Sequence, residues 1–242
     1  MLKRTSILIM AGVFAAVGSE ARAQTQPAPA MRGFANINFG AQASSRSIGR
    51  TDTFTVYGED ATLVTDQHLG SGALFDVSGG YRFRKNLAGA IGFSNFQNHD
   101  NSGVTATVPH PLIFNSPVTV TTSVSDLQHS ERGVHLSAVW FFPITTQMDV
   151  AFSAGPSFIL VKQEVVSSVT IPPGTQDASP NVSTENKTAF GVNLGVDGTY
   201  LFTRTFGAGV FLRYAGGKTD LPSVEDLGVG GFQVGVGGRV RF

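Results

Sequence analysis

The sequence predicts an all-β protein, an eight-stranded antiparallel transmembrane β-barrel with short periplasmic turns and long extracellular loops. Three observations support this fold class. The N-terminus is typical of a secretory signal, apolar side chains recur at every second position over long segments, and the connections alternate between short and long. The composition suits such a sheet, because charged residues make up only 14% of the 242 residues, whereas 29 are glycine and 19 are phenylalanine.

Charge balance and cysteine content exclude several functional classes. The formal net charge is +0, so no basic surface predicts binding to nucleic acid. The chain has no cysteine, which removes disulfides, thiolate metal sites, a cysteine nucleophile and an acylated lipoprotein cysteine. We expect no metal and no cofactor, since none of the five histidines shows a metal-ligand spacing: His68, His99, His110, His129 and His135.

Residues 1–23 are predicted to be a cleaved secretory signal peptide. Lys3 and Arg4 precede the apolar segment 7–17, which is too short to cross a bilayer as a helix, and Ala21-Arg22-Ala23 forms a small-residue cleavage site. A retained N-terminal anchor fits these flanks less well. Residues 24–32 are then a flexible leader and residues 33–242 the barrel, which we expect in the outer membrane of a Gram-negative bacterium.

Strands are predicted where apolar and polar residues alternate with a period of two. In the segment 188–202, Phe190, Val192 and Leu194 alternate with Asn193 and Asp197 in this way. The same alternation predicts strands over residues 33–43, 69–83, 87–98, 131–142, 148–163, 188–202, 206–216 and 229–242.

The connections between these strands distinguish a membrane barrel from a soluble β-sandwich. Segments 84–86, 143–147 and 203–205 are short, whereas the others are long and polar: 44–68, 99–130, 164–187 and 217–228. A sandwich also alternates, but its strands are usually shorter. An aromatic girdle is expected beside the short turns, formed by Tyr81, Phe83, Trp140, Phe142, Tyr200, Phe202, Phe206 and Phe242. An even strand count places both termini on this side.

The C-terminal segment GVGGRVRF, residues 235–242, resembles the C-terminal signal of bacterial outer-membrane barrels. Phe242 supplies the terminal aromatic, Val240 the hydrophobic residue two positions earlier, where an aromatic is commoner, and Gly237 the glycine. The resemblance implies that the barrel-assembly machinery recognises this segment. Residues 33–242 as a whole are similar to the small eight-stranded barrels of the OmpA, OmpX and OmpW kind, and we expect a monomer surrounded by outer-membrane lipid.

A cluster of polar side chains is predicted inside the barrel, on the face opposite the apolar one. The lumen of an eight-stranded barrel is narrow enough to be filled by side chains, and buried charges require partners. We expect Arg213 to contact Asp76, Asp197 or both, and to help block the lumen. The alternative is a narrow, gated path for water or ions. The predicted lumen cluster comprises Asp76, Arg82, His135, Asp197, Arg213, Arg239 and Arg241.

An apolar triplet, Leu112, Ile113 and Phe114, lies between prolines in the second long connection. It either packs over the barrel mouth or forms an exposed anchor for an unknown extracellular partner.

These features favour a structural or surface-interaction role with a plugged lumen. The alternative is a narrow channel or a path for small hydrophobic molecules, as in the OmpW kind. A third function, a lipid-modifying hydrolase, would use His135 and Ser137, which are spaced as in lipid A deacylases. By our register both face inward and no carboxylate partner lies on the lipid side, so we expect no enzymatic activity.

Overall fold

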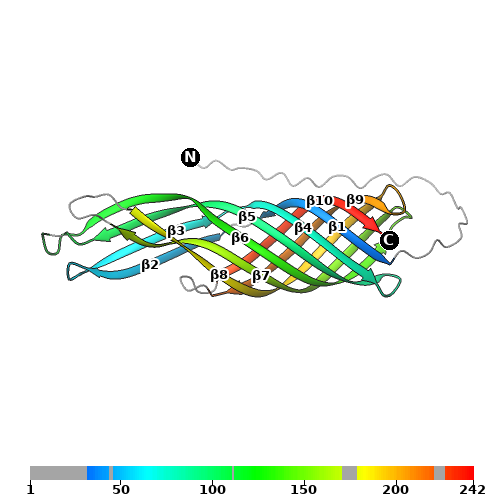
Figure 1. Ribbon diagram of the computed structural model, residues 1–242, viewed down its shortest axis with the longest axis horizontal. Helices are drawn as coiled ribbons and strands as arrows, with labels where there is room; N and C mark the ends of the chain where they lie inside the picture. Colours follow the sequence, from blue (N-terminus) through cyan, green and yellow to red (C-terminus); the bar gives the residue numbers. More distant parts are fainter. Residues whose placement is uncertain (1–31, 44–45, 111, 171–178, 221–226) are drawn as a thin grey trace, which may run out of the picture. The chain divides into compact units, whose positions relative to one another are not determined.

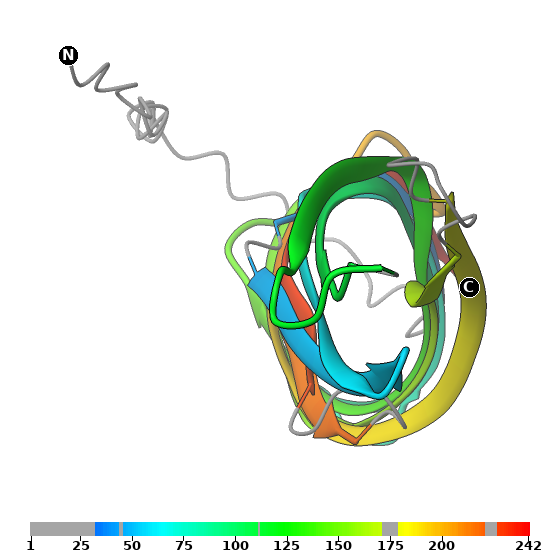
Figure 2. The ribbon, with the colours of Figure 1, turned by 90° about the vertical axis from the view of Figure 1, so that its left-hand side faces the viewer.

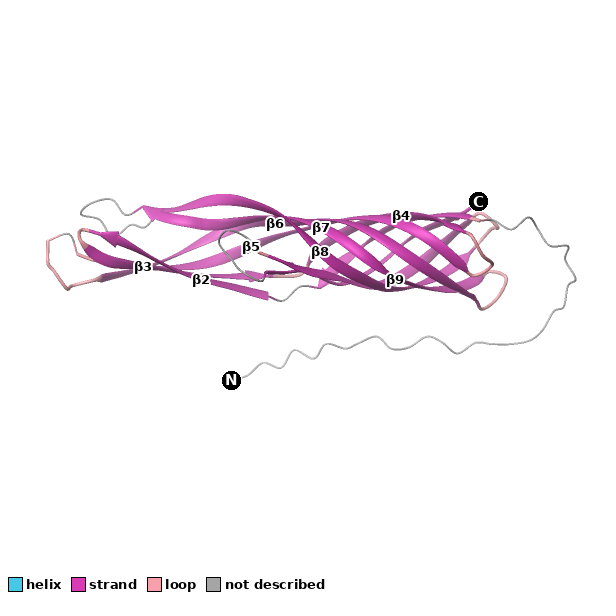
Figure 3. Ribbon diagram, turned by 90° about the horizontal axis from the view of Figure 1, so that it is seen from below, coloured by secondary structure: helices cyan, strands magenta, loops and turns pink. Residues whose placement is uncertain are grey.

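The computed structural model of the protein describes residues 32–43, 46–110, 112–170, 179–220 and 227–242. The predicted signal peptide, and the predicted leader up to residue 31, lie outside the described residues. Within them the chain folds into strands joined by turns, as Figure 3 shows. No helix in this part of the chain is long and apolar enough to cross a membrane.

In the part of the chain that the structure describes, ten strands form one antiparallel sheet. The order across it is β2-β3-β5-β4-β1-β10-β9-β8-β7-β6, and a further pairing of β5 with β6 closes eight strands into a ring, which Figures 1 and 2 show from the side and along its length. The predicted eight-stranded antiparallel barrel is thereby confirmed. The strands are β1 Gly33–Ala43, β2 Arg46–Val56, β3 Glu59–Leu69, β4 Gly72–Arg82, β5 Leu87–Val108, β6 Val118–Pro143, β7 Met148–Thr170, β8 Ser179–Leu201, β9 Phe206–Thr219 and β10 Leu227–Arg241.

The short turns and the ends of the ring lie together. β4 joins β5, β6 joins β7 and β8 joins β9 through turns that match the predicted tight connections. Gly33 and Phe242 exchange main-chain hydrogen bonds of 2.7 and 3.0 Å, and the N–H of Arg241 donates to the carbonyl of Thr205 in the last of these turns at 2.8 Å. Both ends of the ring therefore lie at the tight-turn end, as predicted.

The predicted inward and outward faces of the ring strands are confirmed. Phe190, Val192 and Leu194 are exposed on the outside, whereas Asn193 between them is buried. The eight aromatic residues predicted to form a girdle are all exposed, and two neighbouring pairs, Trp140–Phe142 and Tyr200–Phe202, have their ring centroids 5.6 and 5.5 Å apart. The ring thus carries an apolar belt on its outer surface.

The segments predicted to be long loops are largely strands, which is the main correction to the sequence prediction. Strands β5, β6, β7 and β8 continue far beyond the ring, and the hairpin β2–β3 joins them, since Thr62–Gln67 pairs with Ser102–Thr107. We call this region the extension: the described residues of 46–69, 98–128 and 164–188. Among the described residues of the four predicted loop segments, those outside strands are 57–58, 109–110, 112–117 and 220.

The strands of the extension were not predicted because their apolar residues face inward and their polar residues face outward, the reverse of the ring. Leu63, Val104 and Val166 are buried in one cluster inside the extension, whereas Thr121 and Ser123 lie exposed on its outer face. Valine and threonine both favour extended backbone. A search for strands with an apolar outer face and a polar inner face therefore passes over such segments, although they too alternate with a period of two.

Candidate functional site

The candidate site is the lumen of the ring, where all seven residues of the predicted cluster lie on the inward face. Asp76, His135, Arg239 and Arg241 are buried, and Arg82, Asp197 and Arg213 are partly buried. The polar contacts in the lumen fall into four levels, from the tight-turn end to the base of the extension.

At the tight-turn end, one carboxylate lies between two arginines. Asp149, at the start of β7, accepts from Arg241 at 3.1 Å, and its other oxygen lies 3.9 Å from Arg82. The guanidinium of Arg82 also stacks over the ring of Phe141, with its central carbon 3.8 Å from the ring centroid. Asp149 was missing from the predicted cluster, although its position on the inward face of the strand predicted over 148–163 could have identified it.

In the middle of the lumen, Arg239 is almost completely buried and pairs with Asp197. The Nη2–Oδ2 distance is 2.6 Å, and Nη1 donates to Oδ1 of Asn38 at 2.5 Å. Arg239 lies on β10 and reaches Asp197 on β8 across the intervening strand β9. Gly209 makes this reach possible, because a Cβ at that position would lie 2.6 Å from Nε of Arg239.

Above this level, Arg213 pairs with Asp76, one of the two partners predicted for it. Its Nη2 lies 2.7 Å from Oδ2 of Asp76, and its Nε donates to Oε1 of Gln233 at 2.7 Å. The pairing register places Arg213 opposite Gly195, while Asp197 lies opposite Phe211, two residues closer to the tight turns. Because of this offset, Asp197 forms an ion pair with Arg239, and Asp76 forms one with Arg213.

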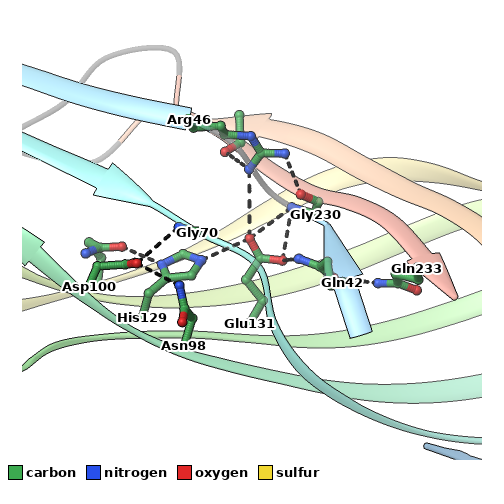
Figure 4. A network of polar contacts seen from close by, with 11 residues as sticks. Gln42, Arg46, Gly70, Asn98, Asp100, His129, Glu131, Gly230 and Gln233 are labelled. Carbon is green, nitrogen blue, oxygen red and sulfur yellow. Dashed lines mark hydrogen bonds and ion pairs between the residues drawn. The ribbon is translucent and has the colours of Figure 1, made fainter. Parts of the chain in front are cut away.

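The fourth level lies at the base of the extension and centres on Glu131, which was not in the predicted cluster. Its carboxylate accepts from the Gly230 N–H at 2.9 and 3.0 Å and from Nε2 of Gln42 at 2.8 Å, and lies 3.1 Å from Nε2 of His129. Figure 4 shows this arrangement with Arg46 and Gly230 beside Glu131. Arg46 donates to the carbonyls of Gly228 and Gly230. Glu131 opens the predicted strand 131–142 on its inward face, a signal that could have identified it.

Gly230 has a backbone conformation that explains this contact. Its φ is +81°, and an added Cβ would lie 1.9 Å from the carbonyl oxygen of Ala215. A side chain is therefore excluded, and the local bend aims the Gly230 N–H at the carboxylate.

Together these contacts form one continuous chain of polar side chains, which we call the lumen string. Each neighbouring pair is joined by a hydrogen bond or ion pair. The longest of these contacts runs from Nη2 of Arg241 to Oγ1 of Thr199 and measures 3.5 Å. In order, the lumen string is Asp149, Arg241, Thr199, Asp197, Arg239, Asn38, Asp76, Arg213, Gln233, Gln42, Glu131, His129 and Gln163.

His135 and Ser137 belong to a second, smaller network rather than to a catalytic pair. The two ring nitrogens of His135 bond to the hydroxyls of Ser94 at 2.9 Å and Ser157 at 2.7 Å. Ser137 donates instead to Oδ1 of Asn193 at 2.8 Å. Both side chains face the lumen, as the predicted register required.

The lumen retains a small cavity of about 90 Å³, lined by Asp76, His135, Arg213 and Arg241 among others. Two nitrogens of Arg241, Nε and Nη1, are buried without a hydrogen-bond partner among the described residues. A cavity of this volume is large enough to hold water, which could satisfy such donors. Because the lumen string crosses the interior from Asp149 to Gln163, it suits a role in fixing the strands and obstructing the interior.

The predicted assembly signal and loop triplet lie at opposite ends of the described barrel and extension. Phe242 is exposed beside the tight turns, and Gly237 allows close strand approach, because a Cβ there would lie 1.9 Å from the carbonyl oxygen of Ile37. Leu112, Ile113 and Phe114 are exposed by 88%, 56% and 73% at the far end of the extension, so they do not pack over the barrel mouth.

Neither a protein-family model nor a curated protein sequence matches the chain. Among solved structures it is similar to Neisserial surface protein A, with 16% identity, a TM-score of 0.47 and coverage of 88% of this chain and 98% of that chain. The outer membrane protein OprG from Pseudomonas aeruginosa gives 11% identity, a TM-score of 0.48 and coverage of 87% and 96%. The N-terminal β-barrel domain of OprF from Pseudomonas aeruginosa gives 14% identity, a TM-score of 0.43 and coverage of 88% of this chain and 98% of that chain.

Proposed function

We propose that the chain is an outer-membrane β-barrel protein with a structural or surface-interaction role, whose lumen is closed by its own side chains. The observation that carries this proposal is the polarity of the ring, with an apolar belt outside and the lumen string inside. In water, such a belt would leave many large apolar side chains exposed, among them Phe39, Phe158 and Val236. In a bilayer the same belt is matched to the lipid tails.

Basic residues just beyond the belt mark its boundary on the side of the extension, and because the short turns of such barrels face the periplasm, we propose that the extension lies outside the cell. Arg132, Lys162 and Lys218 are exposed on strands β6, β7 and β9, close to the last belt residues Leu160 and Phe190. Cationic side chains at this level suit anionic lipid headgroups. The tight turns then face the periplasm, and the barrel-assembly machinery is the partner we propose for the segment that ends in Phe242.

The location is tested by fractionating cells and measuring heat-modifiable mobility on gels. We expect the chain in the outer-membrane fraction, with a folded form that migrates differently from the boiled form. Phe242→Ser should lower the amount of this folded form, whereas Tyr57→Ser, which changes an exposed aromatic of the extension, should not. An abundant folded form in the soluble fraction would contradict the proposal.

The closed lumen is tested by conductance in planar bilayers. A channel needs a continuous path, whereas the lumen string spans the interior from Asp149 to Gln163. We expect no steady channel from the unaltered protein and a measurable conductance from Arg213→Ala, which removes one side chain from the string. Steady conductance of the unaltered protein would instead support the narrow channel.

A further inference from the structure

The far end of the extension presents a second group of exposed apolar side chains, separate from the belt. Leu112, Ile113 and Phe114 lie in the turn between β5 and β6, and Tyr57, which is 54% exposed, lies in the turn between β2 and β3. Figures 1 and 3 show both turns at the end opposite the tight turns. We call these four side chains the tip.

Three main-chain donors of the β5–β6 turn already have partners. The N–H groups of Leu112 and Ile113 donate to Nδ1 of His110 at 3.1 and 3.2 Å. The N–H of Asn115 donates to Oε1 of Glu59 at 2.8 Å, which also ties the two turns together. A donor without a partner is costly in an environment that offers no hydrogen bonds. Because of these contacts, the β5–β6 turn can move from water into an apolar layer without leaving the N–H groups of Leu112, Ile113 and Asn115 unpaired.

Charges near the tip are few and negative. Residues 101–125 contain no Lys, Arg, Asp or Glu, and the acidic residues nearest in sequence to Tyr57 are Glu59 and Asp60. The β5–β6 turn itself carries no charged side chain. The carboxylates beside it belong to Glu59, which accepts from the Asn115 N–H, and to Asp60, and an anionic surface would repel both. The apolar partner that fits this pattern is electrically neutral.

The tip also stands well clear of the membrane in which the barrel is proposed to lie. Along β6, the segment from Arg132 to Val118 covers roughly 45 Å of strand. The hydrogen bond from the Asn115 N–H to the Glu59 carboxylate, which ties the two turns together, lies within the extension itself, between the β5–β6 turn and β3. The surface it reaches therefore belongs to something that faces the cell.

We propose that the tip inserts into a neutral lipid surface apposed to the cell, with Leu112, Ile113, Phe114 and Tyr57 entering its apolar layer. Exposed apolar side chains on a projecting turn can be buried in such a layer, which gains free energy for each side chain removed from water. The inference rests on the proposed function only in that the barrel holds the extension outside the membrane.

The absence of cysteine in the natural sequence allows a direct test. Asn115→Cys and, as a matched control on the outer face of β6, Ser123→Cys are each labelled with an environment-sensitive fluorophore in protein held in lipid nanodiscs. Phosphatidylcholine vesicles containing a quencher-labelled lipid are then added. We expect quenching and a blue shift at position 115 and neither at position 123.

Two comparisons make the test decisive. Leu112→Ser with Phe114→Ser should reduce vesicle binding at least tenfold, and replacing a third of the phosphatidylcholine by phosphatidylglycerol should weaken it. Unchanged emission with phosphatidylcholine vesicles would overturn the proposal, as would a response to fatty-acid-free serum albumin alone, which would assign the tip to protein pockets. Heat-modifiable mobility of the same samples reports separately on the barrel, so failure of tip insertion is distinguishable from failure of the proposed function.

Discussion

The ring and the extension share strands β5 to β8 but bury opposite kinds of side chain, polar in the ring and apolar in the extension. Along β5 the same inward face carries Ser94 in the ring and Val104 in the extension, while the outward face changes from Phe93 to Thr105. In the proposed membrane location, lipid surrounds the ring and its polar groups must meet inside, whereas water surrounds the extension and its apolar groups must meet inside. The polarity of a strand thus follows its surroundings along its length, without any change of fold.

The largest expected effect comes from breaking the buried ion pair that marks the ring. Arg239→Ala leaves the carboxylate of Asp197 and the amide oxygen of Asn38 without their partner, and should lower the free energy of unfolding by about 3–5 kcal/mol. Urea-induced unfolding in vesicles measures this. Arg204→Ala, in an exposed tight turn, is the control and should change stability by less than about 0.5 kcal/mol. Equal effects would mean that the lumen pair carries no stability.

A second prediction places a charge on the outer face of each region. Val210→Arg puts a guanidinium in the belt and should destabilise by about 2–4 kcal/mol in a bilayer. Thr121→Arg puts the same group on the outer face of the extension and should stay within about 0.5 kcal/mol. Unfolding in vesicles compares the two variants. If both were equally mild, the belt would not face lipid.

The ring could be predicted from sequence because its apolar face is the outer one, which matches the pattern expected of a membrane strand. Segments around Phe190 and Val210 therefore gave both strand position and orientation. The extension could not be predicted in this way, since Leu63 and Val104 point inward and threonine and serine cover the outside. Such a pattern does not by itself distinguish a polar loop from a water-exposed hairpin.

Within the lumen, the sequence indicated which side chains face inward but only part of how they pair. Asp76 could be predicted as a partner of Arg213 because both lie at similar depth. The pair of Arg239 with Asp197 depends on the stagger between strands and on the space that Gly209 leaves across β9. Neither quantity is encoded in any single segment, so the pairing appears only once the ring is closed.

A third prediction concerns the interior of the extension. Leu63→Ala removes buried apolar contacts with the cluster that includes Val104 and Val166, and should cost about 2–3 kcal/mol. The loss should be confined to the extension, so hydrogen exchange should quicken in β2 and β3 while the ring strands keep their protection. Thr62→Ala, on the opposite face of the same strand, is the control and should leave both regions unchanged. Equal quickening in the ring strands would show that the two regions unfold as one unit.

The smallest expected effect lies at the junction, where Arg46 of β2 donates to the carbonyls of Gly228 and Gly230 at 2.5 Å each. These bonds tie the edge hairpin of the extension to β10 of the ring. Arg46→Ala should cost about 1 kcal/mol, because the side chain is partly exposed and water can replace its donors. Arg46→Lys should recover only part of this, since a lysine cannot present the fork of donors that reaches both carbonyls. Hydrogen exchange of the β2–β3 amides provides the measurement.

The chain offers a matched control for that prediction on the same strand. Arg50 pairs with Asp52 at 2.7 Å but makes its bond within β2, between partly exposed groups, so Arg50→Ala should change exchange little. Faster exchange in Arg46→Ala alone would show that the hairpin is held by its link to β10. Equal exchange in the two variants would instead mean that β2 and β3 depend only on pairing with β5, and that the ring does not stabilise the extension through this junction.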